Sequence, residues 1–388
     1  MTVYVTGIGI ISAIGMNAQE NFESLIARKT GITNIELLKN LDERFLAGEI
    51  KLTNKELAEH IFTSKKTDLP RSLLLSLIAA KEAWQTNTYN NNIRTAFIGA
   101  TTIGGMDLTE QYFKSNKSIK SLNYHHCGKI AEYISNYFGI NDFKTTVSTA
   151  CSSAANAIIL ASRMIKNNIV DRVLVGGGDA LTGFTINGFN SLRIYDNELC
   201  KPFDKNRNGL NLGESAAYLV LENKKSIKIT KNKKIVKILG WGNANDAYHQ
   251  TASSPYGEGA QTAMTEALKI ANLNANDIDY INAHGTATSN NDLSEGRAIE
   301  SIFGEKQLYS STKAYTGHTL AAAGIVELIF SIFSIRHNTI FPVLNYQNKM
   351  KELKTEPVYK LRQDIEINKV LSNSFGFGGN NASIIIGE

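Results

Sequence analysis

The hydrophobic and polar positions of the chain switch repeatedly between short apolar runs and longer stretches with helical spacing. Short apolar or β-branched runs predict strands, and apolar positions three or four residues apart predict helices. Strands are predicted at residues 3–5, 95–99, 145–148, 172–175, 236–239, 278–283, 308–312 and in a final pair within 373–386. Helices are predicted at residues 21–28, 71–84, 130–138, 152–166, 260–271, 293–303 and 320–335. This alternation predicts an α/β fold.

The glycines near the start of the chain suggest a turn. Residues 3–5 are followed by GIGIISAIG, which we interpret as a glycine-bearing turn after a short strand. A dinucleotide fingerprint would need a third glycine where Ser12 stands, so a dinucleotide-dependent oxidoreductase is disfavoured. Residues 34–68 are polar and irregular, and residues 172–175 are continuously apolar. The apolar run is typical of a parallel strand buried on both faces.

Two segments of the chain share one plan. VSTACSSAANAIILASRM and SSTKAYTGHTLAAAGIVELIFSI each contain a strand, a polar turn and a helix of small residues. The first turn carries Cys151 and the second carries His318. We therefore expect two similar βαβ-type halves, residues 1–232 and 233–388, that share a central site. The lysine-rich run KKSIKITKNKK between them is expected to be a solvated surface segment.

Composition bears on the binding partners, the cellular compartment and the metal sites to be expected. The 388 residues carry a net charge of +5, which is too small to indicate nucleic-acid binding. Cys127, Cys151 and Cys200 cannot form a disulfide framework, so we expect a reducing compartment. No basic leader precedes the first apolar run, which is too short to span a bilayer, so a cytoplasmic protein without membrane insertion is expected. His125 and His126 are adjacent to Cys127 and cannot converge on one ion with it, so no metal site is expected.

Cys151 is the candidate nucleophile. It follows residues 145–148, whose composition is typical of a short buried strand, and precedes a stretch without Gly or Pro. At a helix start, free N–H groups and the helix dipole are expected to lower its pKa and favour the thiolate. Ser152 and Ser153 are expected to cap this turn. The alternative is a small buried thiol without chemistry.

Two histidines and a lysine lie in turns beside other predicted strands. His284 ends a strand, Lys313 follows the next one, and His318 opens a helix of small residues. Each could be an ordinary hydrogen-bonded structural residue, but together with Cys151 they form a set typical of covalent catalysis. Cysteine proteases normally have one histidine and an amide or acid that orients it, whereas here a second histidine is present.

Five motifs give the chain a resemblance to a known family. In chain order they are TACSSAANAI, KPFDKNRNGLNLGE, NAHGTAT, KAYTGHTLAAAGIVE and NSFGFGGNNAS. The chain resembles the β-ketoacyl-acyl carrier protein synthases of the elongating type, in the thiolase superfamily. Priming-type synthases resemble it less, because they carry asparagine where His318 stands. The resemblance spans nearly the whole chain and implies a thiolase-like duplicated fold with a layered αβαβα core.

The resemblance also implies an activity, a decarboxylative Claisen condensation of an acyl group with malonyl on an acyl carrier protein. In that reaction Cys151 takes the acyl group, His284 and His318 stabilise the enolate, and Lys313 orients the histidines. Backbone N–H groups of Cys151 and Phe377 form the oxyanion hole. The other implied positions are Gly376 and Phe377 in the gate, Thr286 and Thr288 on the pantetheine arm, Ile103 at the acyl tunnel, and Asp292 and Glu327 as supporting acids.

The resemblance implies an acidic acyl carrier protein as partner and no cofactor beyond the phosphopantetheine arm that the carrier supplies. Lys65, Lys66, Arg71 and Lys201 are expected to dock the carrier. A homodimer is implied, or a heterodimer with a ketosynthase-like subunit. Fatty-acid elongation and a specialised polyene or aryl lipid pathway both stay open.

Departures from the family pattern affect loops rather than catalytic groups. Ser289 replaces a proline and is followed by Asn290 and Asn291, and Ser215 replaces a glycine. These changes bear on the acyl substrate. The alternative function is a non-catalytic partner subunit similar to a chain-length factor. Such subunits lack the cysteine, so Cys151 argues against it.

Overall fold

The computed structural model describes residues 1–388 except 40, 64–67, 86–89, 91 and 116–118. Its main sheet has the strand order β10-β9-β11-β12-β8-β1-β7-β6-β4-β5, and β2 pairs with β3 apart from it. The strands are β1 (Val3–Ser12), β2 (Ile32–Asn34), β3 (Leu46–Gly48), β4 (Thr95–Ala100), β5 (Phe143–Val147), β6 (Arg172–Asp179), β7 (Ser215–Glu222), β8 (Val236–Asn245), β9 (Tyr280–Asn282), β10 (Tyr309–Ser310), β11 (Lys369–Gly376) and β12 (Asn380–Gly387).

The strand order repeats outward from the centre of the sheet. β1 and β8 are adjacent and antiparallel. From β1, two antiparallel pairings lead to β6 and two parallel pairings lead to β5. From β8, two antiparallel pairings lead to β11 and two parallel pairings lead to β10. The duplicated α/β fold expected from the two similar segments is confirmed.

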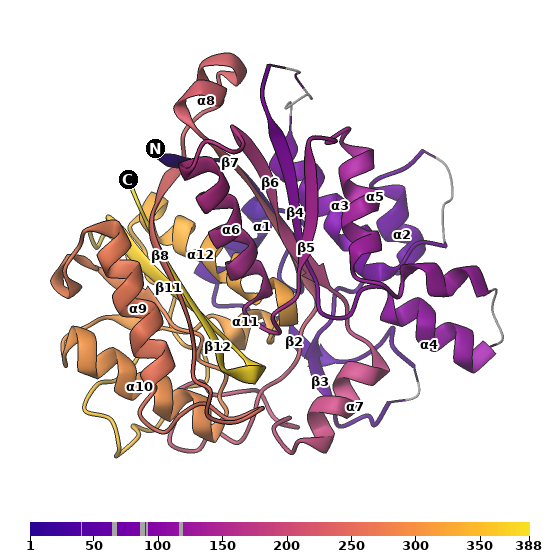
Figure 1. The fold of residues 1–388 in the computed structure, drawn as a ribbon. Helices are drawn as coiled ribbons and strands as arrows, with labels where there is room; N and C mark the ends of the chain where they lie inside the picture. The colour runs from indigo at the N-terminus through magenta and orange to yellow at the C-terminus, as the bar shows by residue number, and fades with distance from the viewer. Residues whose placement is uncertain (40, 64–67, 86–89, 91, 116–118) are drawn as a thin grey trace.

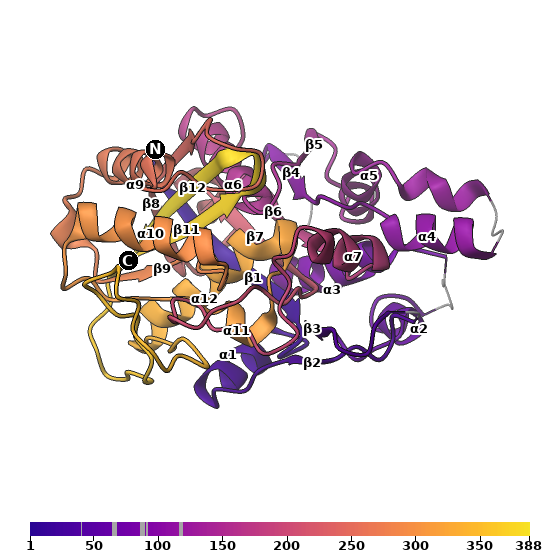
Figure 2. The same cartoon turned by 90° about the horizontal axis from the view of Figure 1, so that it is seen from below.

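Helices cover and separate the two halves of the sheet. They are α1 (Ala18–Ile26), α2 (Asn54–Glu59), α3 (Arg71–Trp84), α4 (Met106–Ser115), α5 (Gly128–Tyr137), α6 (Ser153–Lys166), α7 (Gly183–Ser191), α8 (Lys224–Thr230), α9 (Glu258–Ala271), α10 (Ser289–Phe303), α11 (Lys313–Thr316) and α12 (Ala323–His337). α6 and α12 pack between the halves, α3 and α5 cover one outer face, and α9 and α10 lie on the other (Figures 1 and 2). The result is the layered αβαβα arrangement.

Alternation along single strands explains the layers. In β6, Val173 and Val175 belong to the central core with α6 and α12, whereas Leu174 belongs to the outer core under α3 and α5. In β12, Ile384 contacts the central core and Ile385 contacts the outer core under α9 and α10. Because successive side chains of a strand point to opposite faces, continuously apolar strands suit a sheet buried on both sides.

The glycine-bearing turn predicted after Val5 is wrong, because β1 continues to Ser12. Its glycines serve close packing on α3 instead. A Cβ on Gly7 would lie 2.2 Å from the Ala83 carbonyl oxygen, and one on Gly9 would lie 2.0 Å from that of Ala79. In the second half, Gly240 and Gly242 of β8 lie equally close to α9. Both halves therefore place a helix backbone directly on a glycine-bearing strand.

The strand before Cys151 is not buried as predicted. β5 is an edge strand whose residues are exposed or half-buried, and β4 is its one partner among the described strands. Its β-branched residues fit an edge as well as a core, so composition alone could not distinguish the two. The strand predicted at residues 172–175 is longer than expected, since β6 runs on through three glycines to Asp179.

The two halves are joined at the end of the molecule that carries both chain termini. The lysine-rich run lies at the surface as expected, and most of it forms the short helix α8 (Figure 1). Close to it, Val3 of β1 pairs with Ile238 of β8 on one side. On the other side of β8, Gly387 of β12 pairs with Lys237.

The segment Leu320–His337 is long and apolar enough to cross a membrane by length and composition, but 89% of it is buried inside the protein. It comprises a short 3-10 turn and α12, which packs against α6 in the central core. Its apolar character is therefore accounted for by packing between the two halves of the sheet.

Candidate active site

The turn between β5 and α6 presents Cys151 to a cavity. Ala150, just before the cysteine, has φ 51°, a left-handed conformation that side-chain-bearing residues rarely adopt. Such strain is typical of functional turns. The expected capping is wrong. The Ser152 hydroxyl lies 2.7 Å from both the Thr149 carbonyl oxygen and Asn380 Oδ1, and Ser153 Oγ accepts the Thr149 N–H (2.8 Å). These serines fix the turn rather than the helix end.

The predicted lowering of the Cys151 pKa is also wrong. Burial raises the pKa of this thiol to about 11, although the Lys313 ammonium and the N–H groups of Phe377 and Cys151 act in the opposite direction. The side chain is only 6% exposed, so the loss of hydration outweighs the helix start. The cysteine is therefore a neutral thiol at neutral pH in the unliganded protein.

The rate of Cys151 alkylation is expected to keep rising with pH well above neutrality. With a pKa of about 11, each pH unit between 7 and 10 raises the thiolate population roughly tenfold, and the thiolate is the nucleophile. Mass spectrometry after brief iodoacetamide treatment measures the rate at each cysteine. Preferential labelling of Cys151 over Cys127 and Cys200 stays a prediction. A Cys151 rate that levels off below pH 8 would contradict the raised pKa.

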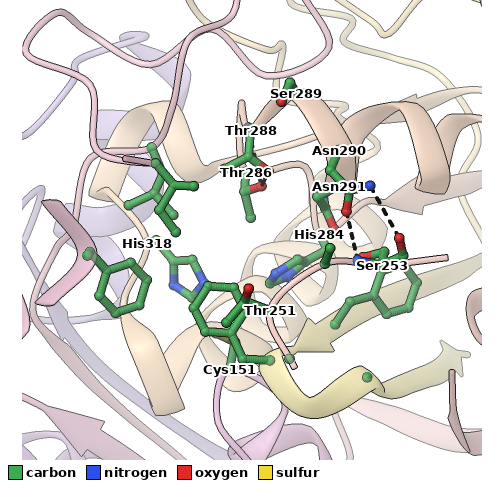
Figure 3. Close-up of a pocket in the computed structure, with 18 residues that line it drawn as sticks. Cys151, Thr251, Ser253, His284, Thr286, Thr288, Ser289, Asn290, Asn291 and His318 are labelled. Atoms are coloured by element: carbon green, nitrogen blue, oxygen red, sulfur yellow. Dashed lines mark hydrogen bonds between the residues drawn. The ribbon is translucent and has the colours of Figure 1, made fainter. Parts of the chain in front are cut away.

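His284 and His318 face the same cavity as Cys151 (Figure 3). Their ring centroids are 5.4 Å apart. Burial and the nearby Lys313 ammonium hold the pKa of each imidazole well below its usual range, so both rings are neutral at neutral pH. The Leu320 N–H donates to His318 Nδ1 (3.1 Å), which leaves the proton of the neutral ring on Nε2.

Lys313 fixes the second imidazole in the same way. Its ammonium group donates to His284 Nδ1 (3.1 Å), to the His284 carbonyl oxygen (2.5 Å) and to Glu327 Oε1. His284 Nδ1 is therefore an acceptor, and its Nε2 carries the proton. The site has two neutral imidazoles, each with an Nε2–H available to an oxygen that gains negative charge. The predicted grouping of Lys313 and Glu327 with the histidines is observed.

Acidic residues hold the loop that carries His284. Asp292 accepts the Thr286 N–H (2.9 Å), as expected of a supporting residue. Glu295, which the sequence analysis did not identify, accepts the N–H groups of His284 and Gly285 (both 2.8 Å). Burial raises the pKa of Glu295 to about 7. Its place one helical turn after Asp292 was the available signal, because both carboxylates then face the same loop.

The gate segment touches the nucleophile turn. A Cβ on Gly376 would lie 3.0 Å from the Thr149 carbonyl oxygen and 3.2 Å from the Cys151 nitrogen, so this position favours glycine. The Phe377 N–H lowers the pKa of Cys151, which places it within reach of the thiol. The Phe377 ring stacks on Phe189 at 5.7 Å between centroids. The sequence did not identify Phe189.

Two cavities meet at Cys151, and Phe189 and Phe377 line both. The first has a volume of about 200 Å³ and contains both histidines, Thr286 and Thr288. The second, of about 370 Å³, is mainly apolar and is lined by Ile103, whose role at an acyl tunnel stays a prediction. We refer to them as the arm cavity and the acyl cavity. Among the residues that the structure describes, no group of three or more His, Cys, Asp or Glu side chains could hold a metal ion.

The structure gives different outcomes for the residues predicted to dock the carrier. The predicted docking role of Arg71 is wrong, because this residue is buried in an ion pair with Glu214 (2.6 Å) and cannot contact a partner at the surface. Lys201 is partly exposed and paired with Glu198 (3.0 Å), so its docking role stays a prediction. Lys65 and Lys66 lie outside the described residues.

Comparison with known proteins agrees with this geometry. Residues 1–226 match the family profile "Beta-ketoacyl synthase, N-terminal domain", and residues 235–347 match "Beta-ketoacyl synthase, C-terminal domain". The 3-oxoacyl-[acyl-carrier-protein] synthase 2 of Coxiella burnetii is 32% identical over 99% of this chain and 98% of its own length.

Solved structures of ketosynthases share the fold. The ishigamide ketosynthase/chain length factor is 28% identical with a TM-score of 0.89, and the match covers 100% of this chain and 98% of the other. The ketosynthase ApeO, solved in complex with its chain length factor ApeC from Xenorhabdus doucetiae, is 30% identical with a TM-score of 0.85 and the same coverage. With the profile match and the Coxiella relative, these likenesses place the chain in the β-ketoacyl synthase family, with the thiolase-like fold.

Proposed function

We propose that the protein is a β-ketoacyl-acyl carrier protein synthase, an acyltransferase that condenses an enzyme-bound acyl group with malonyl on an acyl carrier protein. The observation that carries this proposal is the meeting of Cys151 with two imidazole Nε2–H donors in one cavity. A nucleophile and a pair of donors for a developing oxyanion are the groups that the reaction needs. No cofactor of the enzyme's own is required.

In the first step Cys151 Sγ attacks the thioester carbonyl of the acyl group. The bond from that carbon to the arm's sulfur breaks, and the arm leaves as a thiol with the proton of the cysteine. The N–H groups of Cys151 and Phe377 stabilise the oxyanion formed at the carbonyl. Because burial raises the pKa of the resting thiol, the cysteine must lose its proton for this attack, and the departing arm provides a place for that proton.

In the second step the bond from the malonyl carbon to its carboxylate breaks, and carbon dioxide leaves. The electron pair passes into the thioester enolate, whose oxygen accepts the Nε2–H groups of His284 and His318. The enolate carbon then attacks the acyl-cysteine carbonyl, the carbon–sulfur bond breaks, and the Cys151 thiolate that leaves takes up one proton from solvent. Neutral imidazoles suit this role because they donate without carrying a charge that must be desolvated.

The proposed reaction is tested with the purified chain, an acyl-loaded carrier and a malonyl-loaded carrier. We expect release of carbon dioxide and a 3-oxoacyl product two carbons longer, detected on the carrier by mass spectrometry. The alternative function, a non-catalytic subunit similar to a chain-length factor, predicts no acylation of Cys151 and no product. The presence of Cys151 with both histidines favours the enzyme.

The acyl cavity supports a hydrocarbon chain as the group carried on Cys151. Three hydroxyls lining it already bond within the protein: Thr102 to Asp179 (2.5 Å), Thr185 to the Thr182 carbonyl (3.0 Å) and Ser191 to the Gly188 carbonyl (2.7 Å). A chain rich in keto groups would therefore lose hydration without replacement partners there. Saturated fatty chains and polyenes both fit this description.

Ile103→Phe is expected to shorten the accepted acyl chain. The larger ring would overpack the acyl cavity by about 1–3 kcal/mol, which corresponds to roughly 5- to 150-fold slower acylation by long chains, while short chains are spared. Acylation rates across a chain-length series measure the effect. Ile186→Phe is the control, because Ile186 packs in the same apolar cluster without lining the cavity. An unchanged profile for Ile103→Phe would remove Ile103 from chain-length control.

We also propose that the protein is a homodimer. We further propose that it works in the cytoplasm and that an acidic carrier protein docks near Lys201. Among the described strands β5 pairs with β4 alone, and its first residue, Phe143, is exposed; both support a dimer, since exposed sheet edges readily pair with another strand. Sedimentation of the purified chain should give twice the monomer mass. A stable monomer would instead favour a heterodimer with a ketosynthase-like subunit, as in the complex of ApeO with its chain length factor ApeC.

A further inference from the structure

The two walls of the arm cavity are built differently. One wall is the loop that enters α10, with Thr286 and Thr288 facing the cavity. Asp292 holds the backbone of this loop from inside, and Arg207 holds it from outside through the Thr288 and Ser289 carbonyl oxygens (3.1 and 2.6 Å). The opposite wall is formed by residues 251–253, which belong to a stretch without helix or strand between β8 and α9. Such irregular segments are more mobile than the elements they connect, so hydrogen bonds to neighbouring segments decide how well this wall is ordered.

Asn290 makes the connection that joins the two walls (Figure 3). Its Oδ1 accepts the Ser253 N–H (2.7 Å), and its Nδ2 donates to the Ser253 carbonyl oxygen (3.2 Å). One side-chain amide thus satisfies both backbone groups of one residue, as a neighbouring strand would. Ser294, one turn further along α10, donates to the Ser254 carbonyl oxygen (2.7 Å) and extends the attachment.

The other end of this wall is attached to the gate. The Gly378 N–H donates to the Gln250 carbonyl oxygen (2.7 Å). Residues 251–253 therefore lie between a backbone bond to the gate and the amide of Asn290. Without Asn290 the wall would be fixed at the gate and at Ser254, and its cavity-facing part would be free to move away from Thr286 and Thr288.

We propose that Asn290 is a positioning residue for the pantetheine arm of the substrate carrier. Its amide fixes Ser253 and so holds residues 251–253 at the width that lets the arm contact both walls. This inference rests on the proposed condensation activity. Asn290 itself is exposed at the mouth, so its loss changes the order of the wall more than the stability of the fold.

The test compares two malonyl thioesters with Asn290→Ala and the parent enzyme, by release of carbon dioxide. Malonyl-pantetheine carries the full arm, whereas malonyl-N-acetylcysteamine lacks the outer part of the arm. We expect KM for malonyl-pantetheine to rise about five- to tenfold with kcat nearly unchanged, since two hydrogen bonds that order the wall are lost. KM for the short thioester should not change. Asn290→Asp keeps the acceptor and loses the donor. Its KM for malonyl-pantetheine should lie between those of the parent and Asn290→Ala.

Arg297→Ala is the matched control. Arg297 also lies on α10 and donates to a carbonyl oxygen of the same stretch, Pro255 (2.8 Å), but neither residue lines the arm cavity. It should leave both KM values unchanged. Amide hydrogen exchange at Ser253 should be faster in Asn290→Ala than in the parent. An unchanged KM for malonyl-pantetheine, or an equal rise with both thioesters, would overturn the role of Asn290. Absence of turnover in the parent enzyme would instead overturn the proposed function.

Discussion

Cys151→Ala is expected to abolish condensation while decarboxylation of malonyl thioester continues. The cysteine is the acyl acceptor, so no 3-oxoacyl product can form without it. The Nε2–H groups of His284 and His318 do not depend on the thiol, because Lys313 and the Leu320 N–H fix the two rings. His318→Ala should show the complementary loss. Removing one such donor costs about 10²- to 10³-fold in rate, so decarboxylation should fall by that factor while acylation of Cys151 persists.

Two assays separate these half-reactions. Release of carbon dioxide from malonyl-loaded carrier reports decarboxylation, and mass spectrometry of the protein reports acylation. Cys127→Ala and His60→Ala serve as controls, since neither residue lines the arm or acyl cavity. If Cys151→Ala and His318→Ala both lost acylation alone, the assignment of the histidines to the enolate would be wrong.

Lys313→Met is expected to damage both the site and the fold. Lys313 and Glu327 are buried partners, and removal of one member of a buried ion pair typically costs about 3–5 kcal/mol of unfolding free energy. The variant also frees His284 Nδ1 to take the proton, which would turn its Nε2 from a donor into an acceptor. Decarboxylation should therefore fall at least as far as in His318→Ala.

Lys313→Met should also change how the unfolding free energy depends on pH. Burial already raises the pKa of Glu327 to about 7, and the Lys313 ammonium opposes that rise. Without Lys313 the pKa rises further, so the folded protein binds a proton that the unfolded chain releases near pH 4–5. The unfolding free energy of Lys313→Met should therefore decrease as pH rises from about 5 to 8.

The double variant Lys313→Met/Glu327→Gln is the control for the ion pair. It removes both charges, so denaturant unfolding should show most of the stability restored and the added pH dependence lost. Activity should stay low, because nothing then fixes the His284 ring. A double variant as unstable as the single one would show that the ion pair is not the source of the loss.

The sequence predicted the chemistry of the site better than its electrostatics. Cys151, His284 and Lys313 could be found because each closely follows a strand, and His318 because it opens a helix of small residues. Parallel strands bring such turns to one edge of a sheet. The Cys151 pKa could not be predicted, because burial by the gate and the histidine loop depends on segments more than a hundred residues away. The helix start acts only locally.

Sequence patterns were also ambiguous where glycine or charge has two structural uses. The glycines of β1 suggested a turn, yet they allow α3 to pack on a strand, and only the position of that helix distinguishes the two. Arg71 looked like a surface cation, but it pairs with Glu214, which is 143 residues away in the sequence. Such partners cannot be inferred from local composition.

The pairing of both chain ends with β8 bears on how the protein could have been assembled. Val3 and Gly387 flank the start of this strand on opposite sides, so the termini lie about two interstrand spacings apart, or about 10 Å. A linker of several residues would join Glu388 to Met1 without disturbing either strand. Opening the chain after α8 would then give a circular permutant in which the second half precedes the first, with Cys151 and the histidines in unchanged places. The order of the two halves along the polypeptide is therefore immaterial to the architecture.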